Sequence, residues 1–244
     1  MAARFRLILR VQPYRIARRL SKRDLGGMME QNASQRVPAV ILAGGRGARM
    51  GGADKALLPL AGRPLVAHLI ARLAPQCARI AINAGGDPGR FAFTGLPVLG
   101  DEMQGQPGPL AGILAALDWA AGLGASAVVT AAVDTPFLPT DLVPRLRGAA
   151  GPSGAAVAAS PDAEGEMRLH PVFGLWPVAA RDGLRAWLAA GDRKVMLWAQ
   201  SQRVGVAEFS ALPFDPFLNV NTPEDLSLAE SLAVRSRPGP GRAG

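Results

Sequence analysis

The sequence predicts a single doubly wound α/β domain with a mostly parallel sheet, and three observations support this prediction. Short apolar runs alternate with runs of helical spacing along residues 37–147. The run at 125–133 is almost continuously apolar, as expected of a strand that helices cover on both faces. With 244 residues, of which 49% are hydrophobic, the chain can bury one sizeable core.

The first half of the domain follows a strand–helix alternation. Gly, Pro, Asp and Asn residues bound the apolar runs and mark their ends. Strands are expected at 37–43, 78–84, 97–99 and 125–133, and helices at 64–73, 110–121 and 140–147.

The second half is less regular. We expect strands at 155–160, 167–176 (interrupted by Pro171) and 204–209 (an edge strand), and helices at 179–190 and 193–199. A last helix follows Asn221: Thr222 caps it, Pro223 takes its first position and Asp225 completes a capping box.

Charge is concentrated at the two ends of the chain. Residues 1–24 carry a net +7 and residues 235–244 a net +3 out of a total of +8, so residues 25–234 carry −2. We therefore expect a disordered basic extension at 1–36, a domain at 37–234 with halves 37–147 and 148–234, and a disordered tail at 235–244. No nucleic-acid partner is expected for the domain, although the basic arm keeps that alternative open.

The extension is rich in arginine and poor in acidic residues, so a mitochondrial transit peptide is the alternative to a simple appendage. The sequence contains no run of about 18 apolar residues, so no membrane span is predicted. The single cysteine, Cys77, permits neither an internal disulfide nor a thiolate metal cluster, and we expect it to be buried. The expected location is the cytoplasm.

Residues 39–60 read as a strand that enters a glycine-rich, cationic loop. Five glycines between 44 and 52 are interleaved with Arg46, Arg49 and then Lys55. Glycine lets the backbone approach a ligand closely, and successive N–H groups with cationic side chains bind anions. The loop is predicted to hold phosphate, although the Walker A spacing is absent because Ala56 follows Lys55.

Three polar residues, Asn83, Asp101 and Asp134, lie where predicted strands end; loop solvation is the alternative role for Asp101, and ordinary turn chemistry is the alternative for Asn83. Because the carboxyl ends of parallel strands share one edge of the sheet, they should lie beside the glycine-rich loop. A carboxylate next to phosphate needs a cation between them, and Mg²⁺ takes one or two carboxylates plus phosphate oxygens. Asp134 is the predicted ligand, and a turn-capping role is its alternative.

Covalent catalysis is not indicated. No serine lies in a nucleophile-elbow pattern, and Cys77 has no activating partner in the sequence. His170 lies in an apolar strand, where a hydrogen-bonded structural histidine is the alternative to a functional one.

The run LAGGRGARMGGADKALLPL resembles the signature L-A-G-G-x-x-x-R-M-G-x-D-K of the molybdenum cofactor guanylyltransferase family, within the nucleotidyltransferase superfamily. INAGG, the aspartate before QPGPLAG, DTPFLP and NVNTPEDL follow in the family's order over about residues 37–232. The resemblance implies a Rossmann-like nucleotidyltransferase fold. It also implies transfer of GMP from GTP to Mo-molybdopterin, with Mg²⁺, and molybdoenzyme maturation proteins as further partners.

Matched residue by residue, the resemblance implies catalytic roles for Arg49, Lys55 and Asp134, with Asp134 as metal ligand. The implied GTP contacts are Leu42, Ala43, Gly44, Gly45, Lys55, Asn83, Asp101 and Asp134. The implied contacts to the acceptor are His170, Arg193, Lys194, Asn219 and Asn221. Gly47 departs from the family, which often has serine there, and removes one hydroxyl contact.

Three alternatives remain open. A cytidylyltransferase for the same cofactor and a sugar-phosphate nucleotidyltransferase usually begin L-A-A-G, where this chain has Gly44 and Gly45. A non-catalytic GTP-binding or carrier module would not need both Lys55 and Asp134.

Overall fold

A computed structural model describes residues 36–44, 54–100 and 108–235, all within one compact unit of the chain. The strands are β1 (Ala39–Leu42), β2 (Pro59–Leu60), β3 (Arg63–Pro64), β4 (Ile80–Asn83), β5 (Val98–Leu99), β6 (Ala127–Ala132), β7 (Ala156–Pro161), β8 (Met167–Pro177) and β9 (Gly205–Glu208). The α-helices are α2 (Leu65–Leu73), α3 (Pro109–Gly122), α4 (Leu142–Gly148), α5 (Arg181–Ala189), α6 (Val195–Ser201) and α7 (Pro223–Arg235). The 3₁₀ turns are η2 (Lys55–Leu57), η3 (Pro88–Thr94) and η4 (Val178–Ala180).

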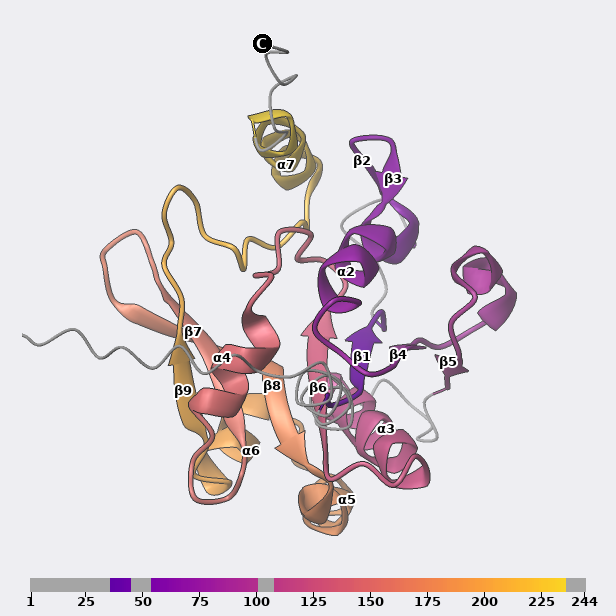
Figure 1. The fold of residues 1–244 in the computed structure, drawn as a ribbon, viewed down its shortest axis with the longest axis vertical. Coiled ribbons are helices and arrows are strands. Elements are labelled where there is room, and N and C mark those ends of the chain that lie inside the picture. The colour runs from indigo at the N-terminus through magenta and orange to yellow at the C-terminus, as the bar shows by residue number, and fades with distance from the viewer. Residues whose placement is uncertain (1–35, 45–53, 101–107, 236–244) are drawn as a thin grey trace, which may run out of the picture. The chain divides into compact units, whose positions relative to one another are not determined.

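Seven of the described strands form one sheet in the order β5-β4-β1-β6-β8-β7-β9 (Figure 1). The pairs β5–β4, β4–β1, β1–β6 and β7–β9 are parallel, whereas β8 runs antiparallel to both β6 and β7. The predicted mostly parallel α/β sheet is thus confirmed, and β9 is the predicted edge strand.

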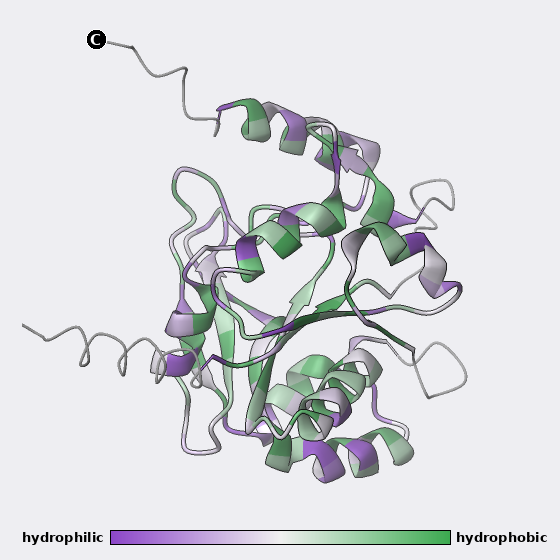
Figure 2. Ribbon diagram, turned by 45° about the vertical axis from the view of Figure 1, so that its right-hand side comes forward, coloured by the Kyte–Doolittle hydropathy of each residue, from purple (hydrophilic) through white to green (hydrophobic). Residues whose placement is uncertain are grey.

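Strand β1 lies at the centre of the parallel part and is buried on both faces. Ala39 and Ile41 belong to the hydrophobic cluster on one face, and Val40 and Leu42 to the cluster on the other. This period of two is the pattern of a strand that helices cover on both sides. Figure 2 shows the central strands mainly in hydrophobic colours, with hydrophilic residues recurring along the helices.

Helices α2 and α4 pack on one face of the sheet, and α3, α5 and α6 on the other (Figure 1). Cys77, which follows α2, is buried as predicted, and burial raises the pKa of its thiol to about 12. None of the helices in the described residues is long and apolar enough to cross a membrane.

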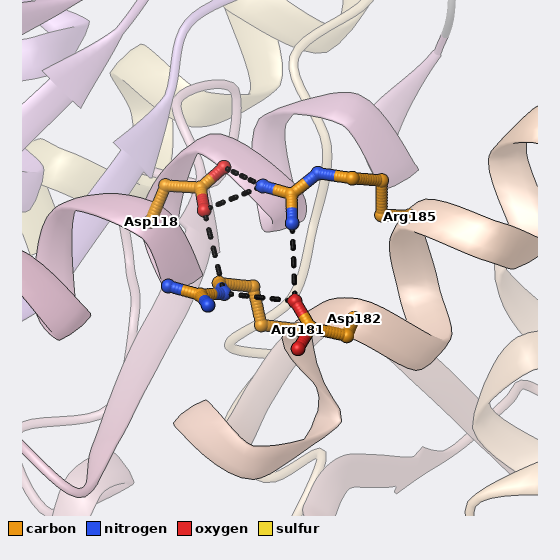
Figure 3. A network of polar contacts seen from close by, with 4 residues as sticks. All are labelled: Asp118, Arg181, Asp182 and Arg185. Carbon is orange, nitrogen blue, oxygen red and sulfur yellow. Dashed lines mark hydrogen bonds and ion pairs between the residues drawn. The ribbon is translucent and has the colours of Figure 1, made fainter.

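Polar contacts also join α5 to α3 (Figure 3). Arg185 Nη2 donates to both carboxylate oxygens of Asp118, at 2.8 and 3.0 Å, and Arg181 Nε lies 3.7 Å from Asp118 Oδ1. Asp182 accepts from both arginines, at 3.1 and 3.2 Å. The network lies at the surface, since the Arg185 and Asp182 side chains are exposed.

A third, smaller hydrophobic cluster joins α7 to the β2–β3 hairpin. Leu60 and Leu65 pack with Val220 and Ala229 in it, and Ala61 N donates to Glu230 Oε1 at 2.8 Å. The last helix therefore packs against the segment that follows Lys55. The hairpin itself, with two-residue strands, is too short for a sequence pattern to reveal.

Pro171 does not interrupt β8, but it lies where the pairing with β7 changes register. Val157 pairs with Gly174 whereas Ala158 pairs with His170, so residues 171–173 form an irregular bulge. Proline lacks the N–H needed for a regular ladder, and a bulge is one of the places in a sheet that accepts it. The basic extension and the tail predicted from sequence lie outside the described residues, apart from Arg36 and Arg235.

Candidate active site

The carboxyl ends of β1 and β6 meet where the path of the chain across the sheet reverses. From β1 the chain adds β4 and β5 on one side, then crosses through α3 to β6 on the other. Leu42 lies beside Ala132, and the Val133 N–H donates to the Leu42 carbonyl at 3.0 Å. Ligands of open α/β sheets bind at such a switch point. Residues 43–44 and Asp134 therefore lie at the favoured position for a site.

One cation and two oxygen-bearing side chains form the polar centre of this edge. The Lys55 ammonium donates to Asp134 Oδ2 at 3.1 Å and to Asn221 Oδ1 at 2.6 Å. The Lys55 and Asp134 side chains are 21% and 20% exposed, so a ligand can reach them from solvent. The structure thus brings together three residues from the beginning, the middle and the end of the domain.

Asn221 is held in place by the start of α7. Asp225 Oδ2 accepts from the backbone N–H groups of Asn221 and Thr222, both at 2.9 Å, and Thr222 Oγ1 accepts from Asp225 N at 3.2 Å. This is the predicted capping box, extended by one residue. The Val220 N–H also donates to the Asp134 carbonyl at 2.8 Å. The segment that carries Asn221 is therefore fixed to the end of β6.

Asn219 lies on the same segment and reinforces this attachment. The fully buried Thr135 donates through Oγ1 to Asn219 Oδ1 at 2.9 Å. Asn219 thus ties its own segment to the residue that follows Asp134.

Lys55 is positioned by a short 3₁₀ turn. The Asp54 side chain accepts from Ala56 N and caps η2, and Ala56 is fully buried in the core. Arg90 Nε pairs with Asp54 Oδ2 at 2.5 Å. The backbone of Lys55 is therefore anchored on both sides, and its ammonium is held by Asp134 and Asn221.

Asn83 ends β4 with a buried side chain that is 2% exposed. Its Nδ2 donates to the Leu99 carbonyl at 3.3 Å. A Cβ atom on Gly112 of α3 would lie 2.6 Å from Asn83 Oδ1 and 3.0 Å from Leu42 Cδ2. Only glycine lets the helix approach this closely, and the carboxyl ends of β1 and β4 are fixed against α3.

His170, on β8 next to β6, belongs to a chain of polar contacts that includes Ser160 of β7. The Ser160 hydroxyl donates to Asp215 Oδ1 at 2.9 Å, and His170 Nε2 lies 2.8 Å from Ser160 Oγ. Because the hydroxyl hydrogen goes to Asp215, Nε2 must donate to Ser160 Oγ. In a catalytic triad the serine donates its hydrogen bond to the histidine, whereas here the histidine donates to the serine. His170 therefore cannot take the serine proton. The His170 ring stacks on Phe217 with centroids 4.5 Å apart.

Burial lowers the pKa of His170 below its ordinary value. Arg168 lowers this pKa further, and Asp215 opposes the change. A pocket of about 340 Å³ lies between the β7–β8 hairpin and residues 211–215, with Asp215 and Ser160, the hydrogen-bond partner of His170, in its wall.

Comparison with known proteins identifies the family. The MobA-like NTP transferase domain matches residues 39–204. A protein of Cereibacter sphaeroides named molybdenum cofactor guanylyltransferase is 55% identical over 197 residues, which cover 81% of this chain and 97% of that protein. A protein of the same name from Rhodopseudomonas palustris is 50% identical over 201 residues, covering 81% and 94%. The chain belongs to the MobA-like NTP transferase family.

Solved structures share the fold of this NTP transferase. Molybdopterin-guanine dinucleotide biosynthesis protein A from Archaeoglobus fulgidus aligns with a TM-score of 0.61 and 22% identity over 82% of this chain and all of that one. The 2-C-methyl-D-erythritol 4-phosphate cytidylyltransferase of Thermus thermophilus aligns at 0.59 and 23%, with the same coverage. The fold therefore accommodates nucleotidyltransferases with different substrates.

Two predicted acceptor contacts of the NTP transferase lie apart from the cluster around Lys55. Arg193 Nη1 donates to the Leu188 carbonyl at 2.6 Å, and Lys194 directly precedes α6. Within the described residues, no hydrogen bond or ion pair connects either side chain to His170, Asn219 or Asn221. Gly45, Arg49 and Asp101 lie outside the described residues.

Sequence reasoning missed several residues around the NTP transferase site. Thr135 and Ser160 bond directly to the predicted residues Asn219 and His170, Asp54 caps the turn that carries Lys55, and Asp215 accepts from Ser160. Asp54 could have been found, because an aspartate two residues before a buried alanine is a capping signal. Ser160 and Asp215 are 55 positions apart and share no recognisable spacing.

Proposed function

We propose that the protein transfers GMP from GTP to Mo-molybdopterin, forming the molybdopterin guanine dinucleotide cofactor and pyrophosphate. An oxygen of the acceptor's terminal phosphate attacks the α-phosphorus of GTP, and the bond from that phosphorus to the oxygen bridging to the β-phosphate breaks. The names of relatives at about 50% identity support the substrates. The observation that carries the chemistry is the Lys55–Asp134–Asn221 cluster at the switch point.

The reaction needs alignment and charge neutralisation more than proton transfer. A phosphate monoester is largely ionised near pH 7, so the attacking oxygen needs no general base. The Ser160 hydroxyl donates to Asp215 and not to His170, which agrees with a mechanism without a covalent intermediate. Lys55 and Arg49 would stabilise the charge on the departing pyrophosphate.

The 37–147 half would bind GTP at the ends of β1, β4 and β6. Backbone groups of Leu42, Ala43, Gly44 and Gly45 would read guanine and wrap the phosphates, with Asn83 and Asp101 at the nucleoside. Because the Asn83 side chain is buried against Leu99 and α3, we expect it to act mainly by shaping the wall of that site.

The chemistry of the donor set at Asp134 fits Mg²⁺. The Asp134 carboxylate and the Asn221 amide oxygen already hold one cation, the Lys55 ammonium. No group of three or more His, Cys, Asp or Glu side chains among the described residues could hold a metal by itself. Mg²⁺ typically uses one or two carboxylates and completes its shell with substrate phosphate and water. When bound, it would supply charge neutralisation at the phosphates.

The 148–234 half would bind the acceptor. The carboxyl end of β7 and the start of β8 lie at the same edge of the sheet as Asp134, since β8 is antiparallel to β6. Two interstrand spacings, about 10 Å, separate β6 from β7. A phosphate near Asp134 could thus belong to a molecule that reaches His170 and the pocket beside Ser160, with Asn219, Arg193 and Lys194 as further acceptor contacts.

We place the reaction in the cytoplasm, with molybdoenzyme maturation proteins as the recipients of the product. Neither proposal depends on the geometry of the site.

A nucleotide competition assay tests the choice of guanine. Purified protein, Mg²⁺ and Mo-molybdopterin are incubated with equal concentrations of GTP and CTP, and the dinucleotide products are separated. Incorporation of GMP is expected. Incorporation from CTP alone would replace this proposal by a cytidylyltransferase, and transfer to a sugar phosphate in place of Mo-molybdopterin would indicate the third activity.

Asp134→Ala separates an enzyme from a carrier module. Loss of the carboxylate should lower kcat by about 10²–10³-fold, because charge at the phosphates is no longer compensated. The matched control is Asp141→Ala, which removes an exposed aspartate that pairs with Arg145 and should leave transfer unchanged. Pre-steady-state product formation checks both variants, and full activity of Asp134→Ala would contradict the metal role.

A further inference from the structure

The Lys55 ammonium lies between the side chains of Asp134 and Asn221. The Lys55 ammonium lies 3.1 Å from Asp134 Oδ2 and 2.6 Å from Asn221 Oδ1, and so contacts both groups proposed above for the divalent ion. An ammonium and a divalent ion on the same oxygens would lie roughly 3–4 Å apart and repel strongly. Lys55 therefore competes with a metal for this position and must turn away for tight binding of the metal.

The contact is built into the fold on both sides. Asp54 and the buried Ala56 fix the backbone at Lys55, and the capping box of α7 fixes Asn221. Asp134 is fixed in turn because its carbonyl accepts from Val220 N. Three anchored backbones thus place the ammonium between two oxygens without help from a ligand.

The Lys55 side chain alone can break this contact without disturbing the fold. Its four-carbon stem carries three donors that can turn toward another anion, and the anchors lie in the backbone around it. A triphosphate at the switch point would offer such an anion. It would also offer the oxygens that complete a divalent ion's shell.

We infer that Lys55 closes the metal position in the nucleotide-free protein, so that a divalent ion enters only together with phosphates that draw the ammonium away. The inference rests on the proposed nucleotide function and adds an order of binding to it. Its consequence is that the free protein binds divalent ions weakly, although it has the side chains to bind them.

Binding of Mn²⁺ to the full chain, followed by electron paramagnetic resonance without nucleotide, tests the inference. Lys55→Met keeps much of the stem and removes the charge. We expect this variant to bind Mn²⁺ at least about tenfold more tightly than the wild type, because no ammonium competes. Lys55→Gln is a second variant should the first fail to fold, and circular dichroism checks both.

Two controls separate occupation of the site from a general charge effect. Arg63→Met removes a positive charge from the same segment, where the guanidinium donates only to the Ala67 carbonyl within the described residues, and should leave Mn²⁺ affinity at the wild-type level. Lys55→Met combined with Asp134→Asn should lose the gain. Equal affinities for wild type and Lys55→Met, or an equal gain from Arg63→Met, would overturn the inference.

Addition of GTP distinguishes the inference from the proposed function. In the wild type, GTP should raise Mn²⁺ affinity at least as much as Lys55→Met does. Failure of the GTP arm alone contradicts the proposed nucleotide. Failure of the Lys55→Met arm alone contradicts closure of the site by Lys55.

Discussion

Gly112 sets how closely α3 approaches the ends of β1 and β4. The closest contacts of an added Cβ atom would be Asn83 Oδ1 and Leu42 Cδ2, both in the wall of the proposed nucleotide site. The position reads as an ordinary residue of an apolar helix in the sequence. Its constraint comes from packing between elements, which no local pattern contains.

Gly112→Ala should therefore destabilise the protein by about 1–3 kcal/mol, because the extra carbon overpacks a rigid contact. Gly122→Ala lies in the same helix with nothing within 4 Å of the added atom. It should be neutral or stabilise by up to about 1 kcal/mol, since alanine is the better helix former. Urea denaturation measures both, and equal free energies of unfolding would contradict the packing argument.

His170 makes the stability of the folded protein depend on pH. Its ordinary pKa of 6.5 is lowered in the folded state by burial, so the folded protein favours the neutral ring. The resulting stability is present above the ordinary pKa and is lost as the pH falls below it toward the folded pKa, because the unfolded chain then binds more protons.

The difference in stability between wild type and His170→Gln should therefore decrease as the pH is lowered from 7 to about 5. Titration of the ring by NMR tests the causes: Asp215→Asn should lower the His170 pKa further, and Arg168→Ala should raise it. A folded pKa above 6.5 would contradict this account.

At the residue scale, the sequence was informative where one residue carries the chemistry. Lys55 and Asp134 stand beside unmistakable features, a glycine-rich loop and an apolar strand, and the structure brings them together. The hydrogen bond between Ser160 and Asp215 depends on the pairing of β7 with β8 and on the path of the loop after β9. Neither is encoded in local spacing, so sequence reasoning could not find it.

On helix α5, the exposed ion pairs contribute less to stability than the buried side chain. The Asp118–Arg181–Asp182–Arg185 network of Figure 3 is largely solvent-exposed, whereas Leu184 on the same helix is fully buried. Exposed ion pairs contribute little because water and salt screen them.

Leu184→Ala should thus cost about 2–5 kcal/mol, and Asp118→Asn less than about 1 kcal/mol, with the second loss shrinking in high salt. Thermal unfolding at low and high ionic strength compares the two variants. A larger loss from Asp118→Asn would mean that charges hold α5 in place.

At the element scale, periodicity found the long helices and the central strands to within about two residues. It failed where a structure depends on a partner, as in the β2–β3 hairpin and the bulge at Pro171. A proline in an apolar run predicts a break, but the irregular pairing with β7 absorbs it.

At the scale of the whole molecule, the fold class followed from the alternation of elements, whereas the strand order did not. The first half obeys the crossover rules of parallel sheets, so its arrangement is nearly determined. The antiparallel β8, inserted between β6 and β7, could not be deduced from the irregular second half.

Deletion of residues 1–36 should leave kcat and KM for GTP unchanged, because every proposed site residue lies between Leu42 and Asn221. A transfer assay compares the truncated and full chains. Binding of each to single-stranded and duplex nucleic acid by fluorescence anisotropy supplies the second readout. Loss of transfer after the deletion would place the basic arm in the mechanism.

The contact between Lys55 and Asn221 spans 166 positions of the chain. During synthesis at about 5–20 residues per second, Asn221 is added roughly 8–33 s after Lys55. Over that interval the strands β1, β4, β5 and β6 can already pair, and Asp134 can already meet Lys55. The growing chain therefore passes through a stage in which the Lys55 ammonium has no Asn221 amide oxygen to contact, and the site is completed only once the segment before α7 has been made.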